Sequence, residues 1–401
     1  MLKKRMFAGL GIGMMTAALV AAQGAPAAPA APGQGAGPGR GAGGAAGAGG
    51  AGQAAGRGGG RGGGDATAEQ WASPSPEAAK WIAQAREIAG DDPDLLFDMG
   101  VFCQPGRGAS GQNRSTVGVP NSEPRLEPYP APSPAQVVGV QRLFDNFYWV
   151  GNTGIGAWII TSDDGYIVYD AMNSAADARD IIVPGMKQAG LDPTKIRYLV
   201  FGHYHGDHTG GGHYLQELSG AQAIQHWADW DLYEQSMRQA AAGQATGSFG
   251  RLDDMTPMTR DIEATDGMEI TIGNTEKVTA TLYQMTGHTP GSLGMIVPVK
   301  YQGTEHPILI ITAGNAFNNI NAFIGGYEHI WDIGIARRVE SVMQAHPNTN
   351  MNLLARTKYV HENYPPAKNP ILYGAERTEK YINIVRACSR AWMVLTGMTQ
   401  Q

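Results

Sequence analysis

The chain has 401 residues and a formal net charge of −6, which indicates no particular polyanionic partner. Its two cysteines, Cys103 and Cys388, form no CxxC pair, and this argues against a zinc site built from cysteines. The length allows two or three domains, but most of the N-terminal quarter lacks the apolar residues that a folded domain needs.

Residues 1–23 have the pattern of a secretory signal peptide. The basic residues Lys3, Lys4 and Arg5 precede an apolar run that ends in small residues. The alternative is a membrane anchor, because the apolar run approaches the length that spans a bilayer. The signal-peptide interpretation predicts a periplasmic or secreted protein without stable membrane association after cleavage.

Residues 24–70 are predicted to be a disordered linker. Glycine, alanine and proline make up almost all of this segment as far as about Gly64, so it has too little apolar surface to offset the entropy of ordering. Its glycine- and arginine-rich stretch resembles repeats of RNA-binding proteins. An exported chain would rarely meet RNA, and three arginines make few phosphate contacts. We therefore expect a spacer and no nucleic-acid partner.

Residues 71–134 are predicted to form a helix followed by an irregular arm. Ser75 before Pro76 is typical of a helix start, and Gly90 is typical of a helix end. Residues 91–134 are rich in proline, glycine and asparagine, which indicates an irregular segment on the surface of the main domain. In an oxidising compartment Cys103 and Cys388 could form a disulfide, and two unpaired thiols are the equal alternative.

The remaining chain, 135–401, alternates strand-like and helix-like segments. Strands are expected at 137–151, 156–171, 196–202, 267–273, 277–287, 293–300 and 306–314. Helices are expected at 175–190, 335–346 and 374–395. Two strand-rich halves, each followed by helices, predict two packed sheets with helices outside them in a single α/β domain.

The stretch "HYHGDH" (203–208) follows one of these apolar strands. His203 and His205 can face one point, because residues i and i+2 of an extended segment project to the same side. Asp207 and His208 follow at a turn. A cluster of imidazole and carboxylate suits zinc, and a catalytic zinc needs three protein ligands and an open position. His288, in "GHTPGS", also follows a strand and is the expected third ligand.

From Val137 to Met393 the chain resembles the metallo-β-lactamase superfamily, most closely subclass B3 and its relatives. The resemblance depends on "YIVYDA", HxHxDH, "DGMEITIG", "GHTPGS" and the closing helices. It implies a four-layer αββα sandwich with two zinc sites at one end. The first zinc would be bound by His203, His205 and His288, and the second by Asp207 and His208.

The family implies one further histidine that completes the second site. His346, followed by Pro347, fits the subclass B3 pattern, and His361 is the alternative. Asn315 takes the position where lactonase- and glyoxalase-type relatives have a metal-bridging aspartate. Because an amide carries no charge to bridge two cations, Asn315 favours the B3-like branch.

These features predict a zinc-dependent hydrolase acting on a small molecule. A zinc held by three histidines lowers the pKa of its bound water, so a metal-bound hydroxide can attack a carbonyl near neutral pH. Asp207 would orient that nucleophile, and Asn315 and Asn318 are candidate substrate-binding residues. The expected substrate is a β-lactam amide. The alternatives are a lactonase or other ester hydrolase, and an exported metal-binding protein without catalytic activity.

Overall fold

The computed structural model describes residues 73–103, 135–244, 249, 252–311, 320–347 and 353–397. All of these lie in one compact unit, residues 54–401. The predicted signal peptide and the predicted linker lie outside the described residues, as do Asn315 and Asn318. Among the described helices, none combines the length and apolar character needed to span a bilayer.

The first sheet has seven strands whose spatial order equals their order along the chain. They are β1 (Val137–Phe144), β2 (Phe147–Asn152), β3 (Gly156–Thr161), β4 (Tyr166–Tyr169), β5 (Ile196–Val200), β6 (Gln222–His226) and β7 (Ile262–Ala264). The first four strands are antiparallel, and β4 to β7 run parallel to one another. The carboxyl ends of β4, β5 and β6 therefore meet at one edge of the sheet.

The second sheet has five strands in the order β12-β11-β10-β9-β8. Its strands are β8 (Met268–Ile272), β9 (Val278–Gln284), β10 (Leu293–Tyr301), β11 (Thr304–Ile311) and β12 (Val342–Gln344). Neighbouring strands are antiparallel except β12, which runs parallel to β11. Two sheets are thus present, as the strand-rich halves of the sequence predicted.

Side chains alternate between a core that lies between the sheets and a core beneath the outer helices. In β3, Trp158 and Ile160 point into the central core, which also contains residues of β8 to β11, whereas Ile159 packs towards the helices. The helices α5 (Val183–Gln188), α7 (Gly212–Ser219) and α8 (Trp227–Ala241) cover the first sheet.

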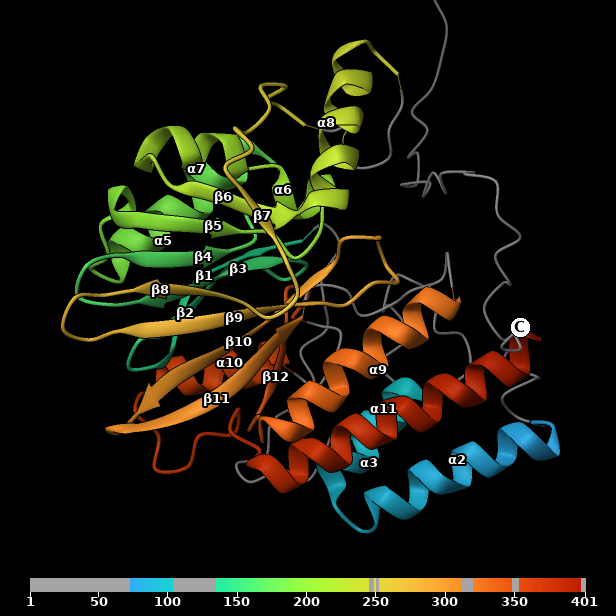
Figure 1. The fold of residues 1–401 in the computed structure, drawn as a ribbon. Helices are drawn as coiled ribbons and strands as arrows, with labels where there is room; N and C mark the ends of the chain where they lie inside the picture. Colours follow the sequence, from blue (N-terminus) through green and yellow to red (C-terminus); the bar gives the residue numbers. More distant parts are fainter. Residues whose placement is uncertain are drawn as a thin grey trace, which may run out of the picture. The chain divides into compact units, whose positions relative to one another are not determined.

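The second sheet is covered by α9 (Ile320–Ala336) and α11 (Ala375–Thr396), which share a buried cluster with the outer residues of β11. A further helix, α10 (Leu353–Glu362), packs beside β1 and contributes to the central core. The order of layers is helix, sheet, sheet, helix (Figure 1), so the predicted four-layer αββα fold is confirmed.

Four short elements complete the first half of the fold. The helical segments α4 (Ala175–Asp177), η2 (Ala178–Ile182) and α5 follow one another, so the helix expected at 175–190 is present. The other short elements are η3 (Pro193–Lys195), before β5, and α6 (Gly206–Thr209), after β5. Together they turn the chain between the parallel strands and bring it back to the same sheet edge.

The N-terminal segment contains two helices, α2 (Pro76–Ala89) and α3 (Pro93–Phe102), both of which contact α11. The first was predicted with its cap: the backbone N–H of Ala78 donates to Ser75 Oγ at 3.4 Å. The second corrects the expected irregular arm. Asp92 caps α3 by accepting two backbone N–H groups, and Pro93 occupies its first turn, where a missing N–H costs nothing.

Cys103 and Cys388 form a disulfide with a Cα–Cα distance of 4.9 Å. Of the two alternatives that the sequence left open, the bridge is the one present. It joins the end of α3 to α11 and fixes the N-terminal helices to the main domain.

The prediction of a helix at residues 335–346 is wrong. Helix α9 ends at Ala336, Arg338 has a φ of +52°, and the chain then enters β12. The apolar residues from Ile335 to Met343 fit a helical spacing, but pairing beside β11 overrides it. The backbone N–H of Leu309 donates to Ser341 O at 3.0 Å, and Val342 is fully buried.

Candidate metal centre

The histidine-rich loop begins where β5 ends, at the edge shared by the carboxyl ends of the parallel strands. Gly202 is fixed on both sides. Its N–H donates to Asp170 Oδ1 at 2.9 Å, and its carbonyl accepts the N–H of Leu293 from the second sheet at 2.7 Å. The loop is therefore tied to both sheets immediately before the first histidine.

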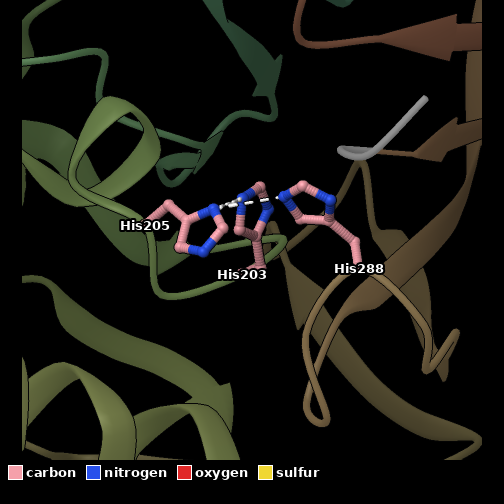
Figure 2. Close-up of side chains that lie close together, drawn as sticks. All are labelled: His203, His205 and His288. Carbon is pink, nitrogen blue, oxygen red and sulfur yellow. Dashed lines mark hydrogen bonds between the residues drawn. The ribbon is translucent and has the colours of Figure 1, made fainter. Parts of the chain in front are cut away.

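Three imidazoles converge at this point. His205 Nδ1 lies 3.0 Å from His203 Nε2 and 3.1 Å from His288 Nε2. Figure 2 shows the rings of His203 and His205, from the loop after β5, turned towards His288, which comes from the turn between β9 and β10. The sequence prediction that these three side chains share a point in space agrees with this geometry.

A second cluster lies beside the first and is centred on the Asp207 carboxylate. Asp207 Oδ2 is 3.5 Å from His208 Nε2 and 3.6 Å from His346 Nε2. His203, Asp207 and His208 also satisfy the spacing of a metal-ligand group, as do the three imidazoles of the triad. The chain thus brings His346, which follows β12, to the loop that follows β5.

The other ring nitrogens of His208 and His346 are held by neighbouring groups. His208 Nδ1 lies 2.9 Å from Asp170 Oδ2, and His346 Nδ1 lies 2.9 Å from the carbonyl oxygen of Gly154. Such contacts fix the tautomer and leave Nε2 as the nitrogen that faces a metal. Both Nε2 atoms accordingly face Asp207.

Asp170 is a site residue that the sequence analysis did not identify. It has a φ of +66°, an unusual backbone conformation for a residue other than glycine, and it is almost fully buried. Its carboxylate contacts both Gly202 and His208. The only sequence signal was an acidic residue at the end of the apolar strand "YIVYD".

Burial and the neighbouring imidazoles weaken the basicity of His203 and His205. Burial, together with the neighbouring imidazoles, holds the pKa of His203 well below its usual range, and burial lowers the pKa of His205 to about 3. Burial alone would raise the pKa of Asp207, but the imidazoles of His208 and His346 outweigh it and bring that pKa to about 2. His203 and His205 thus offer neutral nitrogen donors beside an ionised carboxylate.

The competing histidines lie elsewhere. His361, the alternative to His346, is on α10, where its Nδ1 accepts the backbone N–H of Arg142 at 3.0 Å. His329 is on α9 and pairs with Asp266 at 3.0 Å. The substrate-binding candidates Asn315 and Asn318 lie outside the described residues.

Comparisons with known proteins agree with this geometry. Residues 151–301 match the family model of the metallo-beta-lactamase superfamily, and this segment contains the residues of both clusters except His346. No curated protein sequence is significantly similar to the chain.

Three solved structures share the fold at a TM-score of 0.51 each. A Cronobacter sakazakii metallo-β-lactamase with a HARLDQ motif is 22% identical, and the match covers 63% of this chain and 93% of that one. The subclass B3 enzyme MEM-A1 from a soil metagenome library is 22% identical, with 66% and 97% covered. The Rm3 metallo-β-lactamase is 19% identical, with 64% and 94% covered. Residues 151–301 are therefore similar to the metallo-beta-lactamase superfamily, and the chain shares its fold with a subclass B3 enzyme.

Proposed function

We propose that the protein is a zinc-dependent hydrolase that cleaves a carbonyl compound, with the cyclic amide of a β-lactam as its substrate. The observation that supports this most directly is the convergence of His203, His205 and His288. Their nitrogens come from two segments more than 80 residues apart in the chain and meet within 3.1 Å of a shared atom, His205 Nδ1.

The donor set fits zinc. Two nitrogens bound to one tetrahedral zinc at about 2.0–2.1 Å lie roughly 3.3–3.4 Å apart, which is close to the observed separations. Imidazole nitrogens and a carboxylate oxygen are ligands that zinc accepts readily. His203, His205 and His288 would bind the first ion, and Asp207, His208 and His346 would bind the second.

When bound, zinc would acidify a water molecule and polarise the substrate carbonyl. The residues of this chain would then orient the reacting groups. The Asp207 carboxylate lies between the two clusters and would accept a hydrogen bond from the attacking water. Asp170 and the Gly154 carbonyl would keep His208 and His346 in the orientation that serves the second ion.

The choice of a β-lactam follows from the fold and the second cluster. All three structures described above are metallo-β-lactamases, and the arrangement of Asp207, His208 and His346 is the one that the B3 resemblance implies. We further propose that the protein is exported to the periplasm or beyond the cell. The disulfide supports this, because such bonds persist mainly in oxidising compartments.

Hydrolysis of a chromogenic cephalosporin, followed by removal of zinc with a chelator and its restoration, tests the proposal. His288→Ala should reduce turnover by about a thousandfold or more while leaving the far-ultraviolet circular dichroism unchanged. His306→Ala is the matched control, because His306 pairs with Glu340 at 3.0 Å, outside both clusters. Full activity of His288→Ala would contradict the assignment.

Parallel assays with acyl-homoserine lactones and aryl esters test the substrate class separately from the proposed zinc-dependent hydrolysis. Zinc-dependent turnover of these compounds but not of the cephalosporin would replace the β-lactam with an ester. If none of these compounds is turned over in a zinc-dependent way, the hydrolase proposal itself is contradicted.

A further inference from the structure

A buried carboxylate links the two segments that supply the histidine triad. Asp229 lies in the first turn of α8 and is fully buried. It is not part of either metal-ligand group found among the described residues. Its side chain nevertheless contacts both the loop after β5 and the turn between β9 and β10, and so connects the two segments that carry the triad.

Asp229 forms hydrogen bonds to residues that are adjacent to the triad histidines in the chain. On one side, Oδ2 accepts the backbone N–H of Tyr204, the residue between His203 and His205, at 3.0 Å. On the other side, the same oxygen accepts the hydroxyl of Thr289, the residue after His288, at 2.7 Å. One oxygen atom thus bonds to the immediate chain neighbours of all three histidines.

The second oxygen strengthens the link to the turn. Asp229 Oδ1 accepts the N–H of Gly291 at 2.7 Å. A side chain at position 291 would place its Cβ 2.7 Å from that oxygen, so only glycine allows this approach. Thr289 Oγ1 also lies 2.7 Å from Ser292 Oγ, which fixes the hydroxyl within the turn.

The geometry points to Asp229 as a positioning residue that sets the distance between the His203–His205 loop and His288, and thereby the zinc affinity of the triad. This inference rests on the proposed function in one respect only, that the triad binds zinc. It assigns the link between the two segments to a single side chain on a third element, α8.

A carboxylate suits this position because all three of its partners are donors. An ionised carboxylate only accepts hydrogen bonds, whereas the amide of an asparagine would turn an N–H₂ group towards one of these donors. Burial raises the pKa of Asp229 to about 6, against the effect of its three hydrogen bonds, so the group is mainly ionised at neutral pH.

Zinc affinity, measured on the full chain by competition with a chromophoric chelator at pH 7.5, tests the inference. Partners of metal ligands typically contribute ten- to a hundredfold to metal affinity. Asp229→Asn should weaken zinc binding by about that factor and alter the visible spectrum of the cobalt-substituted protein, which reports the geometry of the histidines. Thr289→Val should cause a smaller loss, and Thr289→Ser, which keeps the hydroxyl, should retain the affinity.

Thr357→Val is the matched control. Thr357 is also fully buried, and its hydroxyl donates to Leu354 O at 2.9 Å within α10. This variant should lower the melting temperature without changing the zinc affinity, because it removes a comparable hydrogen bond that does not touch either histidine segment.

The outcomes separate the two proposals. If the unaltered protein binds zinc tightly and Asp229→Asn and Thr289→Val bind it equally well, the positioning role is overturned while the metal site stands. If the unaltered protein does not bind zinc, the proposed function fails and the positioning role fails with it. Should Asp229→Asn not fold, the contrast between Thr289→Val and Thr289→Ser decides alone.

Discussion

Two polar clusters in this protein differ in whether their charged and polar groups are paired with opposite charges. Where α3 packs against α10 and α11, Asp94 lies between Arg356 at 3.0 Å and Arg377 at 2.8 Å, and Asp92 also pairs with Arg377. Tyr373 lies against both guanidinium groups, with distances of 5.0 Å to its ring. Every charge in this cluster has a counter-charge of its own, as a structural ion-pair network requires.

The histidine triad of the candidate metal centre lacks that internal balance. Its triad consists of imidazoles alone, which supply nitrogen lone pairs aimed at one point but no opposite charges. Such an arrangement is stabilised by a cation, whereas the ion-pair cluster is complete without one. The comparison shows that burial of polar groups does not by itself indicate a functional site, whereas several nitrogen donors directed at one point do.

Removal of one partner from the ion-pair cluster should have the largest effect on stability. Asp94→Ala removes the carboxylate that lies 3.0 Å from the buried Arg356, and losing one partner of a buried pair costs about 3–5 kcal/mol. Urea unfolding measures this loss. Asp180→Ala is the control, because its pair with Arg179 is exposed, and it should leave the free energy of unfolding nearly unchanged. Equal effects of the two variants would contradict the buried network.

Loss of the disulfide should be the next largest effect. Replacing Cys103 and Cys388 together by serine removes a cross-link that closes 285 residues, and native disulfides typically contribute about 2–4 kcal/mol. We expect a lower urea midpoint with unchanged zinc affinity and stoichiometry. A change in zinc stoichiometry would instead show that the two regions are coupled.

His346→Ala sharpens the comparison within the metal centre. This variant removes the nitrogen that lies 3.6 Å from Asp207 Oδ2. The affinity for the second ion should therefore fall about a hundredfold, which is roughly 2.7 kcal/mol of binding free energy. Zinc analysis after gel filtration should then find one ion per chain in place of two. His361→Ala is the control and should retain both ions, and the reverse result would assign the second site to His361.

The smallest expected effect is the pH dependence contributed by Asp92. Burial raises the pKa of Asp92, but its bond to Arg377 and the N–H groups of Leu95 and Asp94 outweigh this, and the net shift is downward from 3.8. The native state therefore holds the ionised form more strongly than the unfolded chain does. The resulting stability is present above about pH 4 and is lost as the pH falls through the native pKa.

Asp92→Asn retains the helix cap and removes the charge, so it isolates this contribution. The stability difference between the two proteins should be below about 1 kcal/mol at pH 6, because Asp92 is partly exposed, and it should shrink towards pH 3. Acid titrations of the unfolding free energy of both proteins measure it. A difference that grows towards pH 3 would reverse the sign and contradict the ion pair.

The sequence predicted most of the fold and most of the centre because both leave local patterns. The apolar run "GAWIIT", followed by a turn signal, indicated a strand, and the spacing of His203 and His205 indicated a shared direction. His288 was identified because it follows a strand and precedes a turn, and His346 because the B3 resemblance implies a late histidine followed by a proline.

The features that escaped prediction depend on contacts between distant segments. Asp170 and Asp229 contact groups between 25 and 62 positions away, and neither position has a local spacing that marks it. The helix expected at 335–346 was wrong for the same reason, since its apolar residues satisfy a helical period, and only the neighbouring edge of β11 makes β12 a strand. Pairing with an available sheet edge overrides a helical spacing of apolar residues.

The bridge between Cys103 and Cys388 also decides what a protease can do to this molecule. A single cut at any position between the two cysteines would leave one covalent particle, with α2 and α3 still attached to α11. The fragments would separate only after reduction. A chain cut once between the cysteines would thus keep its mass and its N-terminal tether under non-reducing conditions.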